Sequence, residues 1–214
     1  ALKLEFIGDS ITSGEGTFGA KQEEDWIPMF FSSLRDYAYL TAKELDAEYR
    51  VLSQSGWGVC NTWDNNPNGA LPKYYRQICG LMQSDMNADL GGNENFDFSS
   101  WQPDAIVVNL GTNDASAFDQ PEWVDNETGK RHKMHKNPDG SYKEEDIAYF
   151  KKAVKDFLHT LRECNPGAQI IWCYGMLGIP FQKPICQAVY EYVDETQDRK
   201  VSYLQLPDTD TDST

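Results

Sequence analysis

Short runs of apolar, β-branched residues recur at wide intervals along the chain, with helical or irregular patterns between them. The clearest run, residues 105–110, is apolar almost throughout, as is typical of a strand buried on both faces of a parallel sheet. Four other runs have the same character, at residues 2–7, 49–52, 170–174 and 201–206. The pattern therefore predicts five strands.

The strongest helical pattern lies between the third and fourth of these runs. Ser141 and Glu144 have the spacing of a capping box, and the segment 165–167, Asn-Pro-Gly, is typical of a helix end. Apolar residues recur between these signals at helical spacing: Ile147, Phe150, Val154, Phe157 and Leu161. His159 follows the core-facing Leu158 and is expected on the helix surface.

Two further helical patterns flank other strands. One precedes the second strand, with apolar positions at Phe30, Leu34, Tyr37 and Leu45, and the other runs through Ile185, Val189, Tyr192 and Val193. Strands that alternate with helices favour a mostly parallel sheet covered by helices on both faces, a three-layer α/β/α architecture. Such sheets bind ligands at the carboxyl ends of their strands, which directs attention to the residues after each strand.

Composition limits the possible partners. The chain has 214 residues, enough for one α/β domain, and 40% of them are hydrophobic. The formal net charge of −15 argues against binding to nucleic acid or anionic lipid, because both are polyanions. No apolar run approaches about 18 residues, so the sequence predicts no membrane span. The five cysteines are widely spaced and odd in number, which does not indicate a disulfide framework, and Cys173 lies in an apolar run expected in the core.

The segments that follow the first three predicted strands carry candidate chemistry for acyl transfer. Ser10 follows the first strand on a Gly-Asp-Ser turn, where its hydroxyl could attack a substrate and its backbone N–H could face an oxyanion. The second strand runs into the glycine-rich segment 55–59, and the third into Asn113, whose amide could donate to the same oxyanion. Together these groups predict an active site at one edge of the sheet.

These segments resemble the signature blocks of the SGNH, or GDSL-type, hydrolases, and most closely the second carbohydrate-esterase family, whose members deacetylate plant polysaccharides such as xylan or glucomannan. The resemblance covers nearly the whole chain and is carried by Ile7–Gly16, with its Gly8-Asp9-Ser10-Ile11, by Ser55–Val59, by Phe98–Asp104 and by Gly111-Thr112-Asn113-Asp114. It implies a flavodoxin-like fold. It also implies that Ser10 is the nucleophile and that the N–H groups of Ser10 and Gly58 and the Asn113 amide form the oxyanion hole, with Gly58 favoured over Gly56.

The histidine of this family follows the fifth strand, but the three histidines here, His132, His135 and His159, all precede it. We therefore expect the catalytic histidine beyond Thr214, with residues 1–214 forming a single domain that lacks its C-terminal catalytic loop and closing helix. The acidic tail, with Asp208, Asp210 and Asp212, is expected to be a solvated loop, and no partner of the histidine is assigned in it. His132 and His135 have His-x-x-His spacing without a third metal ligand in register, and either could instead supply a base from an unusual position.

Other residues near these blocks are candidates for substrate binding. We expect Asp9, Trp57 and Asp114 to contact the substrate, although Asp9 could instead stabilise its turn. Trp57, Trp63 and Trp123 are candidates for the site rim, since aromatic faces suit sugar rings, with packing in the core as the alternative. Two long excursions, 61–69 and 119–140, could border the site or be surface loops. The second carries the basic cluster of residues 130–136, expected to be solvated or, alternatively, to contact an acidic substrate.

The sequence thus predicts a serine esterase that hydrolyses O-acetyl or other short acyl esters on carbohydrate, without a cofactor or metal. A lipolytic esterase, thioesterase or lysophospholipase of the same fold remains an alternative, as does an inactive carbohydrate-binding relative. The expected partner is a small-molecule or polysaccharide ester, not nucleic acid or a membrane. The resemblance also implies secretion.

Overall fold

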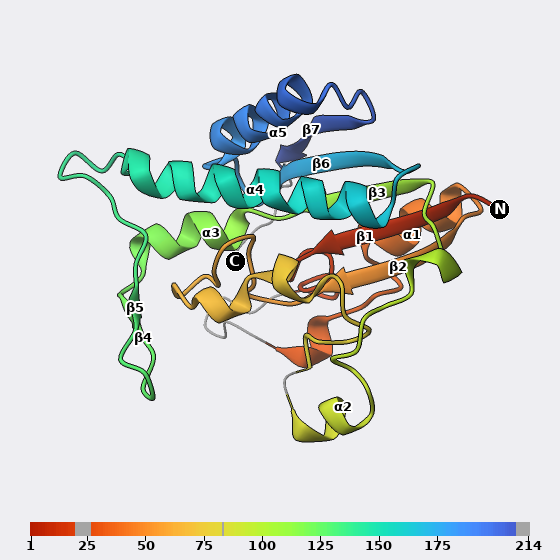
Figure 1. Cartoon of the computed structure of the whole chain (residues 1–214), viewed down its shortest axis with the longest axis horizontal. Coiled ribbons are helices and arrows are strands. Elements are labelled where there is room, and N and C mark those ends of the chain that lie inside the picture. The colour runs from red at the N-terminus through yellow and green to blue at the C-terminus, as the bar shows by residue number, and fades with distance from the viewer. Residues whose placement is uncertain (20–26, 83, 209–214) are drawn as a thin grey trace.

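A five-stranded parallel sheet forms the centre of the protein, which is described here from a computed structural model (Figure 1). The structure describes residues 1–19, 27–82 and 84–208, so most of the acidic tail, including Asp210 and Asp212, lies outside the described residues. The strands are β1 (Lys3–Gly8), β2 (Glu48–Ser53), β3 (Ala105–Asn109), β6 (Gln169–Met176) and β7 (Val201–Asp208). All five predicted strands are confirmed.

The strands are arranged in the order β2-β1-β3-β6-β7, and every neighbouring pair is parallel. This is the flavodoxin-like order, in which the chain reverses its direction of winding between β1 and β3. Ligands of such sheets bind in the crevice outside the carboxyl ends of the strands at that reversal. The topology therefore directs a ligand to the ends of β1 and β3, where Ser10 and Asn113 follow.

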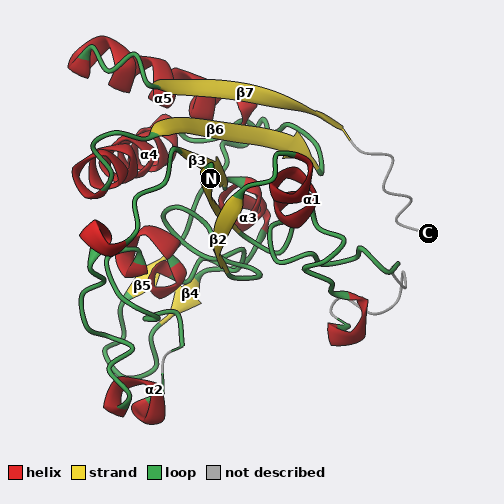
Figure 2. Ribbon diagram, turned by 90° about the vertical axis from the view of Figure 1, so that its right-hand side faces the viewer, coloured by secondary structure: helices red, strands yellow, loops and turns green. Residues whose placement is uncertain are grey.

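Helices cover both faces of the sheet: α4 and α5 lie on one side and α1 on the other (Figure 2). The helices are α1 (Tyr37–Glu44), α2 (Asp85–Asp89), α3 (Thr112–Ser116), α4 (Glu144–Cys164) and α5 (Gln182–Thr196), with short 3₁₀ turns at Pro28–Phe30, Pro67–Gly69, Leu71–Tyr74, Phe98–Ser100 and Ala117–Asp119. The expected three-layer α/β/α fold is confirmed. Among the described residues, no helix has the length and apolar character needed to cross a membrane.

The larger core cluster lies between the sheet and the α4–α5 layer. The predicted helical stripe supplies Phe150, Val154, Phe157 and Leu161, all at most 1% exposed, while Ile147 is only partly buried. Each such side chain contributes about 1.5–3 kcal/mol when fully buried. A smaller cluster on the other face packs Ala38 of α1 against β1. Cys173 is 5% exposed, which confirms its place in the core.

The predicted helix before β2 is wrong in its first half. It begins only at Tyr37, because the Asp36 side chain accepts hydrogen bonds from the backbone N–H groups of Tyr37 and Ala38, at 2.7 and 3.3 Å, and caps the helix there. Phe30 lies in a 3₁₀ turn, and Leu34 is 65% exposed. The prediction from apolar spacing therefore included residues that are not helical.

The capping box predicted for α4 is also wrong. The N-cap residue is Lys143, with no side-chain hydrogen bond, whereas the Ser141 hydroxyl donates to Asp139 at 2.6 Å in the preceding turn. Acidic residues fill the first turn of α4 instead, and negative charge is favourable at a helix N-terminus. The helix still ends at the predicted Asn-Pro-Gly segment.

The two long excursions are joined to each other by one buried side chain. Asn65 is fully buried; its amide nitrogen donates to the carbonyls of Ala117 and Pro121, at 2.8 and 3.0 Å, and its oxygen accepts from the Met134 N–H at 2.9 Å. Residues 119–140 also contain a short antiparallel hairpin, β4 (Trp123–Val124) and β5 (Arg131–His132), which projects from the body of the protein (Figure 1).

Candidate active site

Ser10 lies on the turn directly after β1, where three strand ends meet. Gly8, the last residue of β1, is in register with Ser53 at the end of β2 and with Asn109 at the end of β3. The turn is closed by backbone hydrogen bonds from Ser13 N–H to the Asp9 carbonyl and from Glu15 N–H to the Ser10 carbonyl, each 3.0 Å. The Ser10 side chain is partly exposed, as a nucleophile must be.

A cavity of about 630 Å³ opens at this edge of the sheet. Its lining combines the turn after β1, the segment after β2 and the start of α3: Ser10, Glu15, Gln54, Ser55, Gly56, Trp63 and Asn113. The structure thus brings Ser10 and Asn113 together, as the sequence predicts. Glu15, Gln54 and Ser55 were not expected to take part, although each lies within a segment that was identified as a signature block or directly beside one.

The Asn113 amide is held in a fixed direction at the start of α3. Its nitrogen donates to an Asp9 carboxyl oxygen at 3.1 Å and to the Trp57 carbonyl oxygen at 2.9 Å. These partners come from the turn after β1 and from the segment after β2. The amide therefore links the ends of all three strands and is presented to the cavity in a defined orientation.

Asp9 lies beneath the cavity and does not line it. Its side chain is 1% exposed, and its second oxygen accepts from the Ile11 N–H at 3.0 Å. Burial, reinforced by the nearby Asp114 carboxylate, raises the pKa of Asp9 to about 7. Its burial and these contacts favour the alternative of a turn-stabilising side chain, while contact of Asp9 with the substrate stays a prediction.

Asp114 is likewise fully buried, so its position gives no support to the expected contact with the substrate, which stays a prediction. Its carboxylate accepts hydrogen bonds from the backbone N–H of Val59, at 2.9 and 3.1 Å, and from that of Cys60 at 2.9 Å. Burial raises the pKa of Asp114 against the opposing effect of these N–H groups. The side chain fixes the loop after β2, which carries one wall of the cavity.

The two glycines of the segment after β2 occupy different environments. Gly56, with a φ of +78°, lines the cavity beside Ser10 and Asn113. Gly58 is buried, and a Cβ on it would lie 2.3 Å from an Asp114 oxygen; its carbonyl accepts from Leu71 N–H at 3.0 Å. Gly56 thus lines the cavity and Gly58 does not, and the preference for the Gly58 N–H as the oxyanion donor stays a prediction.

The tryptophans are also placed differently from the expectation. The Trp57 ring packs on Tyr74, with ring centroids 5.2 Å apart, and against the main core, and it does not line the cavity. Trp63 does line it, is 48% exposed and lies over Gly56. Trp123 lies in the projecting strand β4. Of the three tryptophans considered for the site rim, Trp63 lines the cavity, whereas Trp57 packs against the core.

None of the three histidines lines the cavity within the described part of the chain. His132 contacts the Asn61 oxygen at 3.4 Å, His135 pairs with Asp146 at 3.0 Å, and the exposed ring of His159 packs against Tyr192. Within residues 1–19, 27–82 and 84–208 there is also no cluster of three or more side chains arranged to hold a metal ion.

The basic cluster of residues 130–136 binds the protein itself. Lys133 donates to the carbonyls of Ala117 and Phe118, at 3.3 and 3.0 Å, and to that of Gln120. Arg131 pairs with Glu122, and Lys136 with Asp119. These contacts give the cluster a structural role at the base of the hairpin and argue against its use for an acidic substrate.

Comparisons with known proteins identify the family of the chain. Residues 6–205 match the family model described as the GDSL-like lipase/acylhydrolase family. The structure superimposes with a TM-score of 0.94 on an acetyl xylan esterase, Est2A, from the rumen bacterium Butyrivibrio proteoclasticus; the two are 51% identical over 99% of this chain and 56% of Est2A.

Two curated relatives are more distant. The cellulase/esterase CelE of Acetivibrio thermocellus is 27% identical over 97% of this chain and 22% of its own length. An acetylxylan esterase/glucomannan deacetylase of Cellvibrio japonicus is 32% identical over 53% of this chain and 30% of its own length. The chain therefore spans less than a third of these curated relatives and about half of Est2A.

Proposed function

Because the chain belongs to the GDSL-like lipase/acylhydrolase family, we propose that it is a serine esterase that removes acetyl groups from carbohydrate. The observation that carries the proposal is the convergence of Ser10, Gly56 and Asn113, from three different strand ends, on one cavity. Those are the groups that acyl transfer requires: a hydroxyl nucleophile and donors for the oxyanion. The names of the relatives supply the substrate class.

In this mechanism the Ser10 hydroxyl oxygen attacks the ester carbonyl carbon, and its proton passes to a general base. The negative charge that develops on the carbonyl oxygen is stabilised by the N–H groups of Ser10 and Gly56 and by the Asn113 amide. The sugar hydroxyl leaves with a proton, and water then hydrolyses the acetyl-enzyme. We do not assign the base to any of the three histidines, because none of them lines the cavity.

Asn113 suits this role because its direction is set before the substrate arrives. Its two N–H bonds point to the Asp9 carboxyl and the Trp57 carbonyl, and an oxyanion, as the stronger acceptor, would take over one of these hydrogens. The pKa of about 7 makes Asp9 a neutral and weaker acceptor in part of the molecules at neutral pH. We therefore propose that Asp9 and Asp114 position the oxyanion hole without touching the substrate.

The lining of the cavity favours a short acyl group on a sugar over a long acyl chain. Apart from the Trp63 ring and Gly56, its described residues are polar, and none has an aliphatic side chain. A long acyl chain requires an apolar channel, whereas a sugar ring stacks well on an aromatic face. Since polysaccharides are too large to cross a membrane, we further propose that the enzyme acts outside the cell.

The acyl-chain profile of the full-length protein tests this proposal. We expect kcat/KM for 4-nitrophenyl esters to fall by about tenfold or more from acetate to butyrate, because the polar lining of the cavity offers no apolar surface to the added methylenes. Acetate should also be released from acetylated xylo-oligosaccharides. A rate that rises with chain length, or hydrolysis of lysophospholipids in preference to these substrates, would support the lipolytic alternative. Binding of the oligosaccharides without any turnover would support the inactive alternative.

Replacing Asn113 by alanine should lower kcat for acetate release by about 10²–10³-fold with little change in KM, because the amide acts on the transition state. Steady-state kinetics on 4-nitrophenyl acetate measure both constants. Ser116→Ala is the matched control, since Ser116 lies on the same short helix, is exposed and bonds only to the Thr112 carbonyl. Equal effects of the two substitutions would remove Asn113 from the proposed oxyanion hole.

A further inference from the structure

Glu15 is the one charged side chain among the described residues that line the cavity. Its carboxylate accepts a hydrogen bond from the Ser55 hydroxyl at 3.3 Å, and the Ser10 hydroxyl also bonds to it. Within the described residues Glu15 forms no ion pair. The nearest ionisable side chain along the turn is the buried Asp9 carboxyl, which is acidic as well. Among the described residues, no opposite charge therefore compensates the Glu15 carboxylate in this cavity beside Ser10.

The backbone holds Glu15 at this position. It lies between Gly14 and Gly16, which have φ angles of +79° and +74°, and its own N–H donates to the Ser10 carbonyl at 3.0 Å. At Gly14 a Cβ would lie 2.4 Å from the Ser32 carbonyl oxygen, so no other residue fits there without rearrangement. The turn that presents Ser10 thus presents Glu15 as well, at a fixed distance from it.

The carboxylate is only partly satisfied by the protein. Partial burial raises the pKa of Glu15, and the hydroxyls of Ser55 and Ser10 oppose this rise. Two hydroxyl donors leave lone pairs of the carboxylate free, since an ionised carboxylate accepts about four hydrogen bonds. A substrate with a hydroxyl close to the ester can supply another donor, whereas a substrate with its own carboxylate there meets a like charge in a partly buried site.

We propose that Glu15 is a specificity-determining residue that selects neutral sugars: it accepts a hydrogen bond from a free hydroxyl next to the scissile ester and excludes esters on uronic acids or other anionic groups. This inference rests on the proposed function, because it concerns the substrate of the same cavity. Coulomb repulsion between two carboxylates at several ångströms in a partly buried site corresponds to a discrimination on the order of 10–100-fold.

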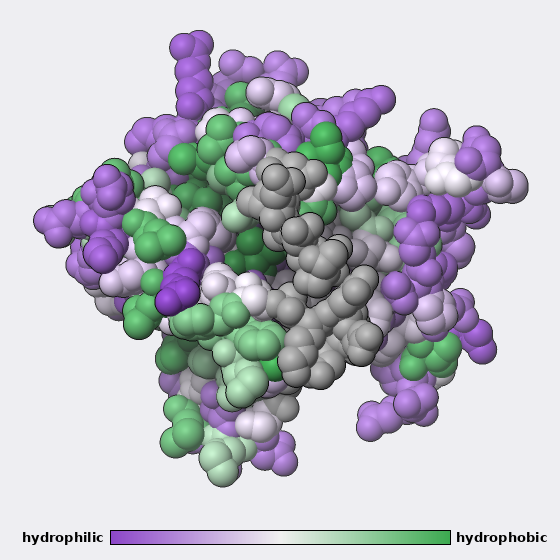
Figure 3. Space-filling model, turned by 180° about the vertical axis from the view of Figure 1, so that it is seen from behind, coloured by the Kyte–Doolittle hydropathy of each residue, from purple (hydrophilic) through white to green (hydrophobic). Residues whose placement is uncertain are grey.

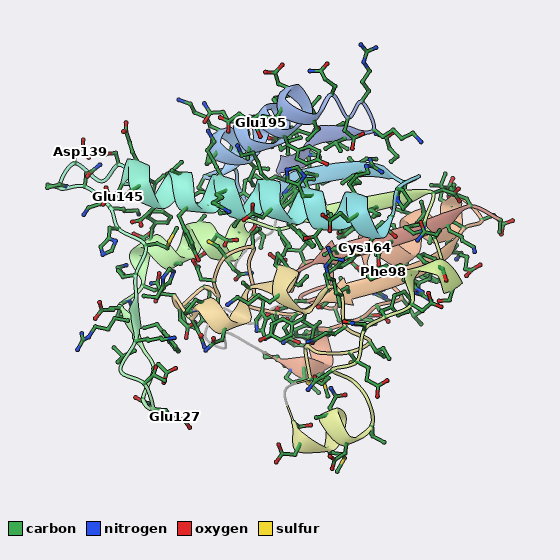
Figure 4. The ribbon with its side chains drawn as sticks, viewed as in Figure 1. Phe98, Glu127, Asp139, Glu145, Cys164 and Glu195 are labelled. Atoms are coloured by element: carbon green, nitrogen blue, oxygen red, sulfur yellow. The ribbon has the colours of Figure 1, made fainter. Side chains whose placement is uncertain are left out.

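The test compares two acetylated substrates that differ in charge at one carboxyl group: an O-acetylated galacturonic acid glycoside and its methyl ester. The full-length wild-type protein should have a kcat/KM about tenfold or more higher for the neutral methyl ester at low ionic strength. In Glu15→Gln, which keeps the size of the side chain, the ratio of kcat/KM for the methyl ester to that for the free acid should fall to about threefold or less. Glu127→Gln is the matched control, because Glu127 lies at the tip of the β4–β5 hairpin, far from the cavity (Figure 4), and should leave the wild-type ratio unchanged.

Salt provides a second measurement that needs no variant. The wild-type ratio should shrink as sodium chloride is raised to about 0.5 M, because ions screen the repulsion, although a partly buried pair is screened less than an exposed one. A ratio that is close to one in the wild type, or that persists in Glu15→Gln, overturns the inference. So does a loss of more than about 10³-fold in Glu15→Gln activity on 4-nitrophenyl acetate, which would place Glu15 in proton transfer.

Failure of the proposed function has a different signature. If the wild type and Ser10→Ala hydrolyse 4-nitrophenyl acetate equally slowly, the esterase assignment itself is wrong, whatever the charge preference. If hydrolysis depends on Ser10 but the ratio does not depend on Glu15, only the role of Glu15 is wrong.

Discussion

Replacing Ser10 by alanine is expected to lower kcat for acetyl ester hydrolysis by on the order of 10⁶-fold, the largest single effect that we predict. The substitution removes the oxygen that attacks the carbonyl, so no acetyl-enzyme can form. The residual rate should come from the oxyanion donors and from binding alone, at about 10³–10⁴-fold over water. Release of 4-nitrophenol from its acetate ester by the purified variants measures the loss, and the unfolding midpoint should stay close to that of the wild type because Ser10 is partly exposed.

Ser13→Ala is the matched control for this experiment. Ser13 lies on the same turn, and its hydroxyl donates to the Asp9 carbonyl at 3.1 Å and to the Ser53 hydroxyl at 2.9 Å. Its loss should cost about 1 kcal/mol of stability and leave the rate within a few fold of the wild type. Retention of activity by Ser10→Ala would contradict the nucleophile assignment, and equal losses in both variants would point to a damaged turn.

The largest effect on stability is expected for Asp114→Ala, which should lower the free energy of unfolding by about 3–5 kcal/mol. The carboxylate is fully buried and satisfies the backbone N–H groups of Val59 and Cys60 together with the Cys60 thiol, at 2.9–3.1 Å. Alanine would leave two buried N–H groups without an acceptor and create a void beside Gly58. Urea unfolding followed by fluorescence measures the change.

Asp119→Ala is the control for this prediction. Asp119 follows Asp114 by five residues, but its side chain is 65% exposed and pairs only with Lys136 at the surface. Exposed ion pairs contribute about 0–1 kcal/mol, so this variant should unfold close to the wild type. A loss of less than about 1 kcal/mol in Asp114→Ala would show that the loop after β2 is held by other contacts.

The strands and the long helix could be predicted because their residues are buried as the pattern requires. Ile106 and Val108 are fully buried in β3, and the stripe of α4 faces the core. The helix before β2 was extended too far because Leu34 and Leu45, which appeared to continue the stripe, are 65% and 52% exposed. The cap at Asp36 was the better signal, because it satisfies free backbone groups directly.

For the site, the rule that ligands bind at strand ends was enough to bring Ser10 and Asn113 together. It could not distinguish Gly56 from Gly58 or Trp63 from Trp57, because these pairs lie close in sequence and differ only in which way the loop turns. The rule also could not show that Asp114 is buried. The N–H groups that Asp114 binds belong to Cys60 and Val59, which precede it by 54 and 55 positions in the chain. Such contacts depend on the tertiary fold and leave no local pattern.

The sheet itself is covered unevenly. Apolar side chains reach the surface on the side away from α4 (Figure 3). Leu204 of β7 is 50% exposed.

The buried Asn65 has a consequence for how the cavity opens. Asn65 makes three hydrogen bonds, to the carbonyls of Ala117 and Pro121 and from the N–H of Met134. These bonds hold the loop that carries Trp63 against the segments on both sides of the β4–β5 hairpin. The loop cannot lift away without leaving buried carbonyls and an N–H unpaired, so the two segments should open and close as a single cooperative unit. The loop that carries Trp63 is therefore expected to move only together with the segment around β4–β5.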